Sequence, residues 1–227
     1  MNIYYIIYFD FMQKRKERVK MCDILETLKG KDADYVLDTW GSRNSFPIDV
    51  VSVAKKIGIQ LGSIDFTDLE KTSAFKDLVN ERGHILGAVF VDEEDVQIVY
   101  SNKLPNEKKF KHLSDDEKRE KLLRRQRFTI AHELAHCCLH MNGKENDHIE
   151  FRTDQINYDD PDEFAANIFA GELLIPTDII VTICNILKNN IRISQLSDIF
   201  RVSKHVMNAR IKYLQEEKKL LRNCTFV

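Results

Sequence analysis

The chain has 227 residues, enough for one or two domains of ordinary size. Hydrophobic residues make up 43% and charged residues 31%, a balance that supports a folded core and excludes a disordered chain. The 34 basic and 36 acidic residues give a net charge of -2, so no global positive field draws the protein onto nucleic acid or an anionic membrane.

The first twelve residues are almost wholly apolar, but they lack the pattern of an export signal. They are too short to span a bilayer and contain Asp10, and the basic run at 14–16 follows the apolar stretch instead of preceding it. The remaining interpretations are a docked strand or an over-extended start. The five cysteines form no C-x-x-C pair, which favours a reducing compartment. We therefore expect a cytoplasmic protein with no membrane partner.

The first half of the chain predicts helices followed by a hairpin. Residues 13–40 are charged and helix-like, and a second helix over 50–57 should end at Gly58. Strand-like residues 86–91 and 96–100 then flank an acidic tetrapeptide, which predicts a β-hairpin. The polar residues 102–118 are expected to form an exposed loop.

Two long helices are predicted in the second half. The first runs from about 116 to 140 and changes from charged to apolar along its length. The second has Asp160 as its N-cap, Pro161 at its first position and Pro176 after its end.

The first of these helices carries the sequence His132-Glu133-Leu134-Ala135-His136, an H-E-x-x-H motif. Residues four apart lie on one helix face, so the imidazoles of His132 and His136 can bind one metal ion. Glu133 is rotated by about 100° from His132, so its carboxylate can accept a proton from water without being a ligand. Zn²⁺ suits such imidazole nitrogens. The flanking residues are mostly apolar, and burying these polar groups there would be costly without a metal partner.

A catalytic zinc site needs a third protein ligand, and the sequence leaves several candidates. Glu163 lies 27 residues beyond the second histidine, in the first turn of the next helix, where it could equally be a capping carboxylate. The weaker candidates are Asp162, Asp147, His148 and His140, of which His140 is better placed for a structural role near the ligands.

Two blocks of the sequence resemble the ImmA/IrrE metallopeptidases of bacteria and their mobile elements. The first is residues 127–136 (RFTIAHELAH), followed by Leu139 and His140, and the second is residues 163–176 (EFAANIFAGELLIP). In that family a glutamate four residues before the asparagine of the second block is the third zinc ligand, which implies Glu163 here. Ala135 stands where glycine is common in the family.

The resemblance runs from about residue 46 to 215 and implies an α+β fold. We expect a helix-rich, zincin-like metallopeptidase domain with a small β-sheet or hairpin over 46–190, after an extension of unknown role over 1–45. It implies one Zn²⁺ per chain, bound by His132, His136 and Glu163, with Glu133 as the catalytic base. The implied activity is that of a zinc endopeptidase whose protein substrate is a helix-turn-helix repressor, cleaved to derepress mobile-element or stress genes.

Residues 191–227 resemble a helix-turn-helix, with two short helices around 201–203 and Ser194 and Ser203 as caps. The apolar residues expected to share a core are Leu196, Ile199, Val206, Met207 and Ile211, and the polar ones expected on the second helix are Lys204, His205, Asn208 and Arg210. Direct DNA binding is the less favoured role, because a module that reads DNA usually has a clearer basic surface.

Two questions of mechanism stay open. Tyr100, His148 and Tyr158 are candidates for a donor to the oxyanion, and the hairpin could hold an extended substrate by strand addition as well as merely pack in the sheet. The alternative functions are a metal-containing, non-proteolytic binding regulator of the antitoxin type and a DNA-binding regulator.

Overall fold

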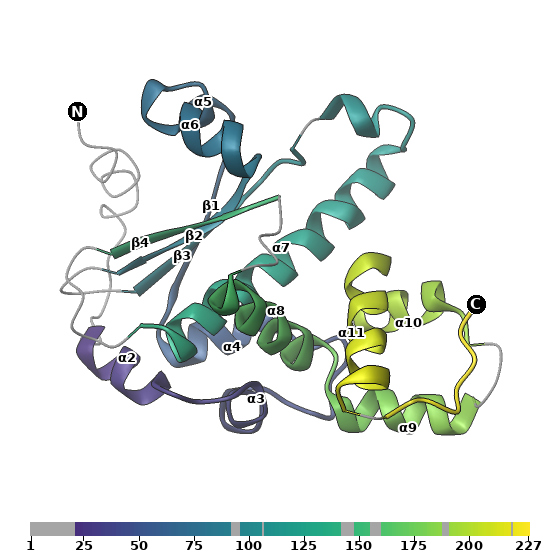
Figure 1. Cartoon of the computed structure of the whole chain (residues 1–227). Coiled ribbons are helices and arrows are strands. Elements are labelled where there is room, and N and C mark those ends of the chain that lie inside the picture. Colours follow the sequence, from purple (N-terminus) through teal and green to yellow (C-terminus); the bar gives the residue numbers. More distant parts are fainter. Residues whose placement is uncertain are drawn as a thin grey trace.

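The computed structural model describes residues 21–91, 96–105, 107–141, 148–154, 160–187, 191–218 and 220–227. Helices surround a small mixed sheet, so the predicted helix-rich α+β fold is confirmed (Figure 1). The apolar N-terminal stretch and residues 13–20 of the first predicted helix lie outside the described residues.

Four strands form the sheet in the order β1-β3-β2-β4. Their bounds are β1 Gln60–Ile64, β2 Ile85–Val91, β3 Val96–Ser101 and β4 His148–Thr153. β1 pairs with β3 in parallel, whereas β2 is antiparallel to both β3 and β4. The hairpin strands are confirmed as β2 and β3, and of the two roles left open for them the pairing favours plain packing in the sheet. Both strands already pair on both sides, and the edges of the described sheet are β1 and β4.

The two faces of the sheet pack against different elements because side chains alternate along each strand. One face contributes Val89, Val91, Val96 and Ile98 to the main hydrophobic core. The other face forms a smaller cluster, in which Ile85, Ala88, Phe90 and Val99 of the sheet pack with two phenylalanines of the helical segment after β1. These are Phe66, just before the first helix, and Phe75, within the second. Those helices, α5 Thr67–Glu70 and α6 Ser73–Arg82, were not predicted.

The N-terminal helices lie on the main-core side. The helix-like stretch ending at residue 40 is two helices, α2 Met21–Leu28 and α3 Ala33–Trp40, separated by Gly30 with a φ of 66°. α4 Val50–Ile57 has the predicted bounds. The Asp49 side chain accepts a hydrogen bond from the Ser52 amide at its start, and Gly58 ends it in the left-handed conformation.

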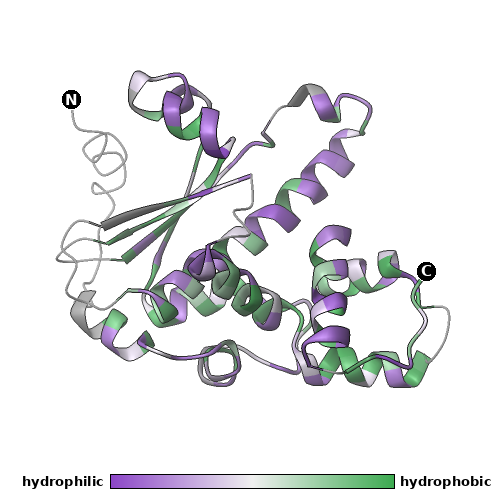
Figure 2. Ribbon diagram, viewed as in Figure 1, coloured by the Kyte–Doolittle hydropathy of each residue, from purple (hydrophilic) through white to green (hydrophobic). Residues whose placement is uncertain are grey.

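The helix that carries the H-E-x-x-H motif is α7, Asp115–Leu139. It begins inside the stretch predicted to be a loop, which also contains a 3-10 helix over Glu107–Phe110. A capping box between Ser114 and Glu117 explains this start, since each group bonds the backbone of the other. The N-terminal half of α7 is hydrophilic and extends away from the core (Figure 2).

Four helices follow β4 in the part of the chain that the structure describes. They are α8 Pro161–Leu174, α9 Thr177–Leu187, α10 Ile193–Phe200 and α11 Lys204–Glu216. Asp160 caps α8 and Ser203 caps α11, as predicted. The expectation for Ser194 is wrong, because Arg192, two residues earlier, is the N-cap of α10 and Ser194 lies inside the helix. α9 was missed because it starts directly after Pro176.

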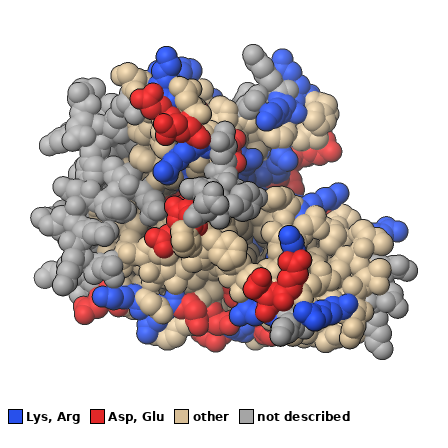
Figure 3. Space-filling model, in the orientation of Figure 1, with Lys and Arg blue, Asp and Glu red and all other residues tan. Residues whose placement is uncertain are grey.

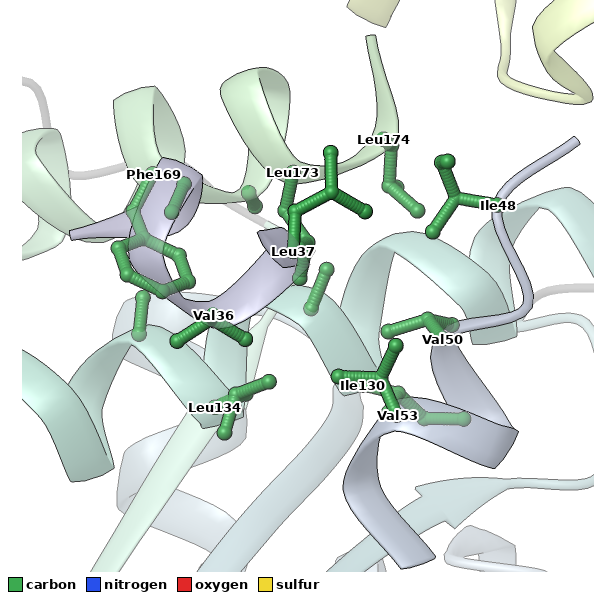
Figure 4. Close-up of a cluster of buried hydrophobic side chains, with 14 of the residues drawn as sticks. Val36, Leu37, Ile48, Val50, Val53, Ile130, Leu134, Phe169, Leu173 and Leu174 are labelled. Carbon is green, nitrogen blue, oxygen red and sulfur yellow. The ribbon is translucent and has the colours of Figure 1, made fainter. Parts of the chain in front are cut away.

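The main core joins helices that are distant in the sequence. Figure 4 shows side chains of α3, α4, α7 and α8 meeting around Leu37, Val53, Ile130 and Leu173. The same cluster continues to Leu214 of α11, so the C-terminal helices share it. No single helix among the described residues is long and apolar enough to cross a membrane, although α8 and α9, bent by 59°, pass that test together.

The C-terminal helices are also fixed to α7 and α8 by arginines. Arg124 of α7 donates to the Val202 carbonyl at 3.0 Å and pairs with Asp198. Arg210 lies on the second helix of this pair, α11, as predicted, but it is only 3% exposed and pairs with Glu172 of α8, so it is not available to a DNA surface. Ile199, expected in the shared core, is 43% exposed. Acidic and basic side chains are interspersed over the face seen in Figure 3.

Candidate metal centre

The second half of α7 is buried all around its circumference, from Thr129 to Cys138. A helix that is surrounded by protein in this way cannot leave polar side chains to solvent. His132 and Glu133 are 0% exposed and His136 is 1% exposed. The two Nε2 atoms of the histidines face each other at 3.0 Å, as expected for imidazoles one helical turn apart.

α8 brings the third candidate ligand to these histidines. Glu163 lies in the first turn of α8, with its Oε2 3.3 Å from His132 Nε2 and its Oε1 3.4 Å from His136 Nε2. The Asp160 side chain accepts the amide hydrogens of Asp162 and Glu163, so it performs the capping. The two roles considered for Glu163 therefore fall on different residues: Asp160 caps the helix and the Glu163 carboxylate faces the histidines.

The spacing of these ligand atoms fits a metal ion. One atom from each of His132, His136 and Glu163 lies within 4.8 Å of the others. Ligands about 2.0–2.2 Å from a tetrahedral zinc lie about 3.3 Å from one another. The separations of 3.0, 3.3 and 3.4 Å match that edge length, and the nitrogen and oxygen donors suit zinc.

Asn167 orients one of the imidazoles, a role that sequence reasoning missed. Its Oδ1 lies 3.1 Å from His132 Nδ1 and accepts the proton on that nitrogen. The Nε2 lone pair of His132 is then free to face the cluster. Asn167 follows Glu163 by four residues, so the same helix face that presents the carboxylate also presents this amide. The four-residue spacing of Glu163 and Asn167 was the sequence signal that could have predicted this role.

Glu133 lies beside the cluster, on the side of α7 that faces β2. Gly87 of β2 has no side chain, and a Cβ built on it would lie 3.7 Å from Glu133 Oε1. The same Cβ would collide with the Thr129 methyl group and would lie 3.0 Å from the Val99 carbonyl oxygen. The glycine therefore allows α7 to approach the sheet closely enough to enclose the Glu133 carboxylate.

Comparison with known families agrees with this geometry. Residues 117–212 match the family model Peptidase_M78, described as the IrrE N-terminal-like domain. These residues, which we call the M78 domain, are similar to an M78 peptidase domain. The match extends from the first turn of α7 into α11 and contains all three members of the cluster. It supports a metallopeptidase of the ImmA/IrrE type, the family that the two sequence blocks resemble. A search of curated proteins finds no significant match to the chain.

The electrostatics of the M78 domain keep its ligand atoms in the forms that bind metals. Burial, together with the charge of Arg152, lowers the pKa of His132 from 6.5 to about 3, so the imidazole is neutral. Burial acts to raise the pKa of Glu163, but the adjacent His132 and His136 hold it below its usual range. A neutral imidazole and an ionised carboxylate are the states that a cation requires.

The other candidates in the M78 domain lie apart from the cluster or outside the description. His140 Nδ1 is 3.4 Å from Asp162 Oδ1, and these two residues form a pair outside the three-residue cluster. Asp147 and Tyr158 lie outside the described residues, and only the backbone of His148 is described, in β4. Cys137 and Cys138 are buried in the main core.

Tyr100, the remaining candidate for an oxyanion donor, lies on β3 outside the M78 match. It is opposite Gly87 in the β2–β3 pairing and packs against the main core. Burial raises the pKa of its hydroxyl. The strand on the other side of Gly87 carries Arg152, a basic residue that the sequence analysis did not select.

Proposed function

We propose that this protein is a zinc-dependent endopeptidase. The observation that carries the proposal is the buried cluster in which His132, His136 and Glu163 each turn one ligand atom toward a common point. Three such ligands leave a fourth position for water or substrate, the arrangement of catalytic zinc sites rather than structural ones. The M78 domain supports a hydrolytic use of the site.

The chemistry follows from the residues around the ion. Zinc bound here would lower the pKa of a water molecule toward about 7 and polarise the scissile carbonyl group. The Glu133 carboxylate accepts a proton from the water molecule whose oxygen bonds to the carbonyl carbon. It then delivers that proton to the amide nitrogen as the carbon–nitrogen bond breaks. Asn167 keeps the His132 ring in the tautomer that faces the ion.

The sheet offers a place for an extended substrate at β4. This strand is at the edge of the described sheet and pairs with β2 on one side only. An added peptide strand would gain backbone hydrogen bonds there and would lie beside the cluster. β4 is thus the strand available for the substrate-binding role that the sequence analysis considered for the hairpin.

We further propose that the substrate is a helix-turn-helix repressor, whose cleavage induces mobile-element or stress genes in the cytoplasm. The support for the repressor is the resemblance to the ImmA/IrrE family in residues 127–136 and 163–176. Among the described residues, Cys138, Cys184 and Cys224 are free thiols, in keeping with a reducing compartment. Arg210 is buried, which weakens the alternative of DNA binding through α11.

The test is co-expression of the protein with the helix-turn-helix repressors encoded beside its gene, followed by mass spectrometry of the partners. The wild-type protein should cut one partner at a defined bond. Glu133→Gln should retain zinc and cut nothing, because it removes the general base and leaves the three proposed ligands in place. The control Asp116→Asn removes an exposed carboxylate from the same helix and should cut normally. Equal cleavage by Glu133→Gln would refute the general-base assignment.

A further inference from the structure

Arg152 occupies a position that points it at the catalytic cluster. It lies on β4 directly opposite Gly87 of β2, and directly opposite residues of an antiparallel pair have side chains on the same face. The direction of a Cβ at Gly87 is toward Thr129 and Glu133, so Arg152 also faces α7. Its guanidinium carbon lies 4.9 Å from the centre of the Phe128 ring, one helical turn before His132.

The guanidinium of Arg152 is buried, and two of its donor nitrogens have no acceptor among the residues that the structure describes. Its Nε and Nη1 are both inaccessible to solvent and hydrogen-bond to no described residue. A buried guanidinium with unmet donors is costly unless an acceptor arrives during function. The acidic groups whose charges act on it are Glu133 and Glu163, the base and the carboxylate ligand of the cluster. The negative charges of these two carboxylates stabilise the buried guanidinium, but neither carboxylate accepts a hydrogen bond from its Nε or Nη1.

The reaction produces the acceptor that is missing. When water adds to the carbonyl carbon, the carbon–oxygen double bond becomes single and its oxygen takes the electron pair as negative charge. Charge-assisted donors held in a water-poor site are the strongest stabilisers of such an oxygen. We propose that Arg152 is a catalytic residue that donates hydrogen bonds from Nε and Nη1 to this oxygen. The inference rests on the proposed peptidase function and adds a residue to it.

Arg152 donates hydrogen bonds and transfers no proton in this scheme. Glu133 carries the proton from water to the leaving nitrogen, so the atoms balance without the arginine. Burial lowers the pKa of Arg152 to about 10, which leaves the guanidinium charged at neutral pH. The proposal gives Arg152, on the edge strand proposed to bind the substrate, the oxyanion role for which the sequence analysis considered Tyr100, His148 and Tyr158.

The first test uses a small probe of the oxyanion site, so it does not depend on knowing the substrate. Methylphosphonate is a tetrahedral anion, and its binding to the cobalt-substituted protein can be followed in the visible spectrum. Arg152→Gln should bind it at least about tenfold more weakly than the wild-type protein, with one metal ion still bound per chain. Arg152→Lys keeps a charge but loses the fork of donors, and should lie between the two.

The matched control is Arg125→Gln. Arg125 is a second largely buried arginine, close enough for its charge to act on Arg152, and its Nη1 also finds no acceptor within the described part of the chain. The acidic residue that acts on it is Asp154 rather than Glu133. Loss of this charge should change methylphosphonate affinity less than about threefold. An equal effect of both substitutions would overturn the proposal, because it would show a general field rather than directed donors.

The second test is the turnover number on a repressor that the wild-type protein cuts. Arg152→Gln should lower kcat by about 100-fold with a small change in KM, as expected for a donor used in the transition state. Unchanged kcat, no methylphosphonate binding by the wild-type protein, or loss of metal from Arg152→Gln would each overturn the proposal. If Arg152→Gln does not fold, Arg152→Lys decides by the same measurements. A wild-type protein that binds metal but cuts no repressor would contradict the proposed function instead. The methylphosphonate measurement distinguishes the two failures, because it tests Arg152 without requiring cleavage.

Discussion

Gly87 of β2 lies against Thr129 of α7 so closely that any side chain at Gly87 would collide with the threonine methyl group. Gly87→Ala should therefore destabilise the protein by about 1–3 kcal/mol, the usual cost of overpacking. It should also weaken metal binding, since α7 must shift to make room. Urea unfolding and zinc titration measure the two effects.

Two further variants separate this steric effect from the loss of glycine as such. Gly171→Ala in α8 places its Cβ 3.5 Å from Arg210 Cδ, an ordinary contact, and should be neutral or stabilising by about 0.5–1 kcal/mol. Thr129→Ser in the Gly87→Ala background removes the colliding methyl group and should restore part of the loss. No recovery in the double variant would locate the strain elsewhere.

Asn167→Ala should weaken zinc binding by about 10–100-fold without removing a ligand. The reason is that His132 Nδ1 would lose its acceptor at 3.1 Å, and the ring would no longer be held with Nε2 toward the cluster. Asn167→Asp keeps an acceptor oxygen and should retain most of the affinity. Competition with a chromophoric chelator gives both constants, and equal affinity of Asn167→Ala and the wild-type protein would exclude the orienting role.

Arg210→Ala should cost about 3–5 kcal/mol of unfolding free energy, because it leaves the part-buried Glu172 carboxylate without its cation. Arg210 also donates to the Ile175 carbonyl at 3.2 Å and to Thr177 Oγ1 at 2.7 Å, so its loss loosens α11 from α8. The exposed Lys204→Ala on the same helix should change stability by less than about 0.5 kcal/mol. Chemical denaturation tests both, and a stable Arg210→Ala that loses DNA binding would instead support the DNA-binding alternative.

The stability of the metal-free protein should fall as the pH falls from about 6.5 toward 3. Burial lowers the pKa of His132 from 6.5 to about 3, so across this window the unfolded chain binds a proton that the folded chain does not. At pH 5.5 the loss amounts to about 1.4 kcal/mol for one group. His132→Gln should show a shallower decline. Urea midpoints at several pH values check this, and parallel curves for the two proteins would argue against a neutral buried His132.

The elements predicted from the sequence are those whose ends are marked locally. α4 and α8 have side-chain caps and a stop at Gly58 or Pro176, so spacing and capping sufficed. β1 was not predicted because its short sequence QLGSI has no alternation, and it is a strand through its pairing with β3. α9 was missed because Pro176 indicates an end and carries no sign that a helix follows at once.

The same division applies to the site. The spacing of His132, Glu133 and His136 is a property of one helix and could be predicted from it. Glu163 could be proposed but not separated from a capping role, because the separation depends on where α8 packs against α7. Gly87 and Arg152 come from strands remote in the sequence, and their relation to Glu133 exists only in the folded sheet.

The most direct test of the account is the zinc content of purified variants by elemental analysis. The wild-type protein should hold one zinc per chain, as should Glu133→Gln and the control Asp162→Ala, which removes an exposed carboxylate next to the proposed ligand. Glu163→Ala should lose the metal, since it removes one of the three atoms that converge on the site. One zinc per chain in Glu163→Ala, at wild-type affinity, would contradict the proposed centre.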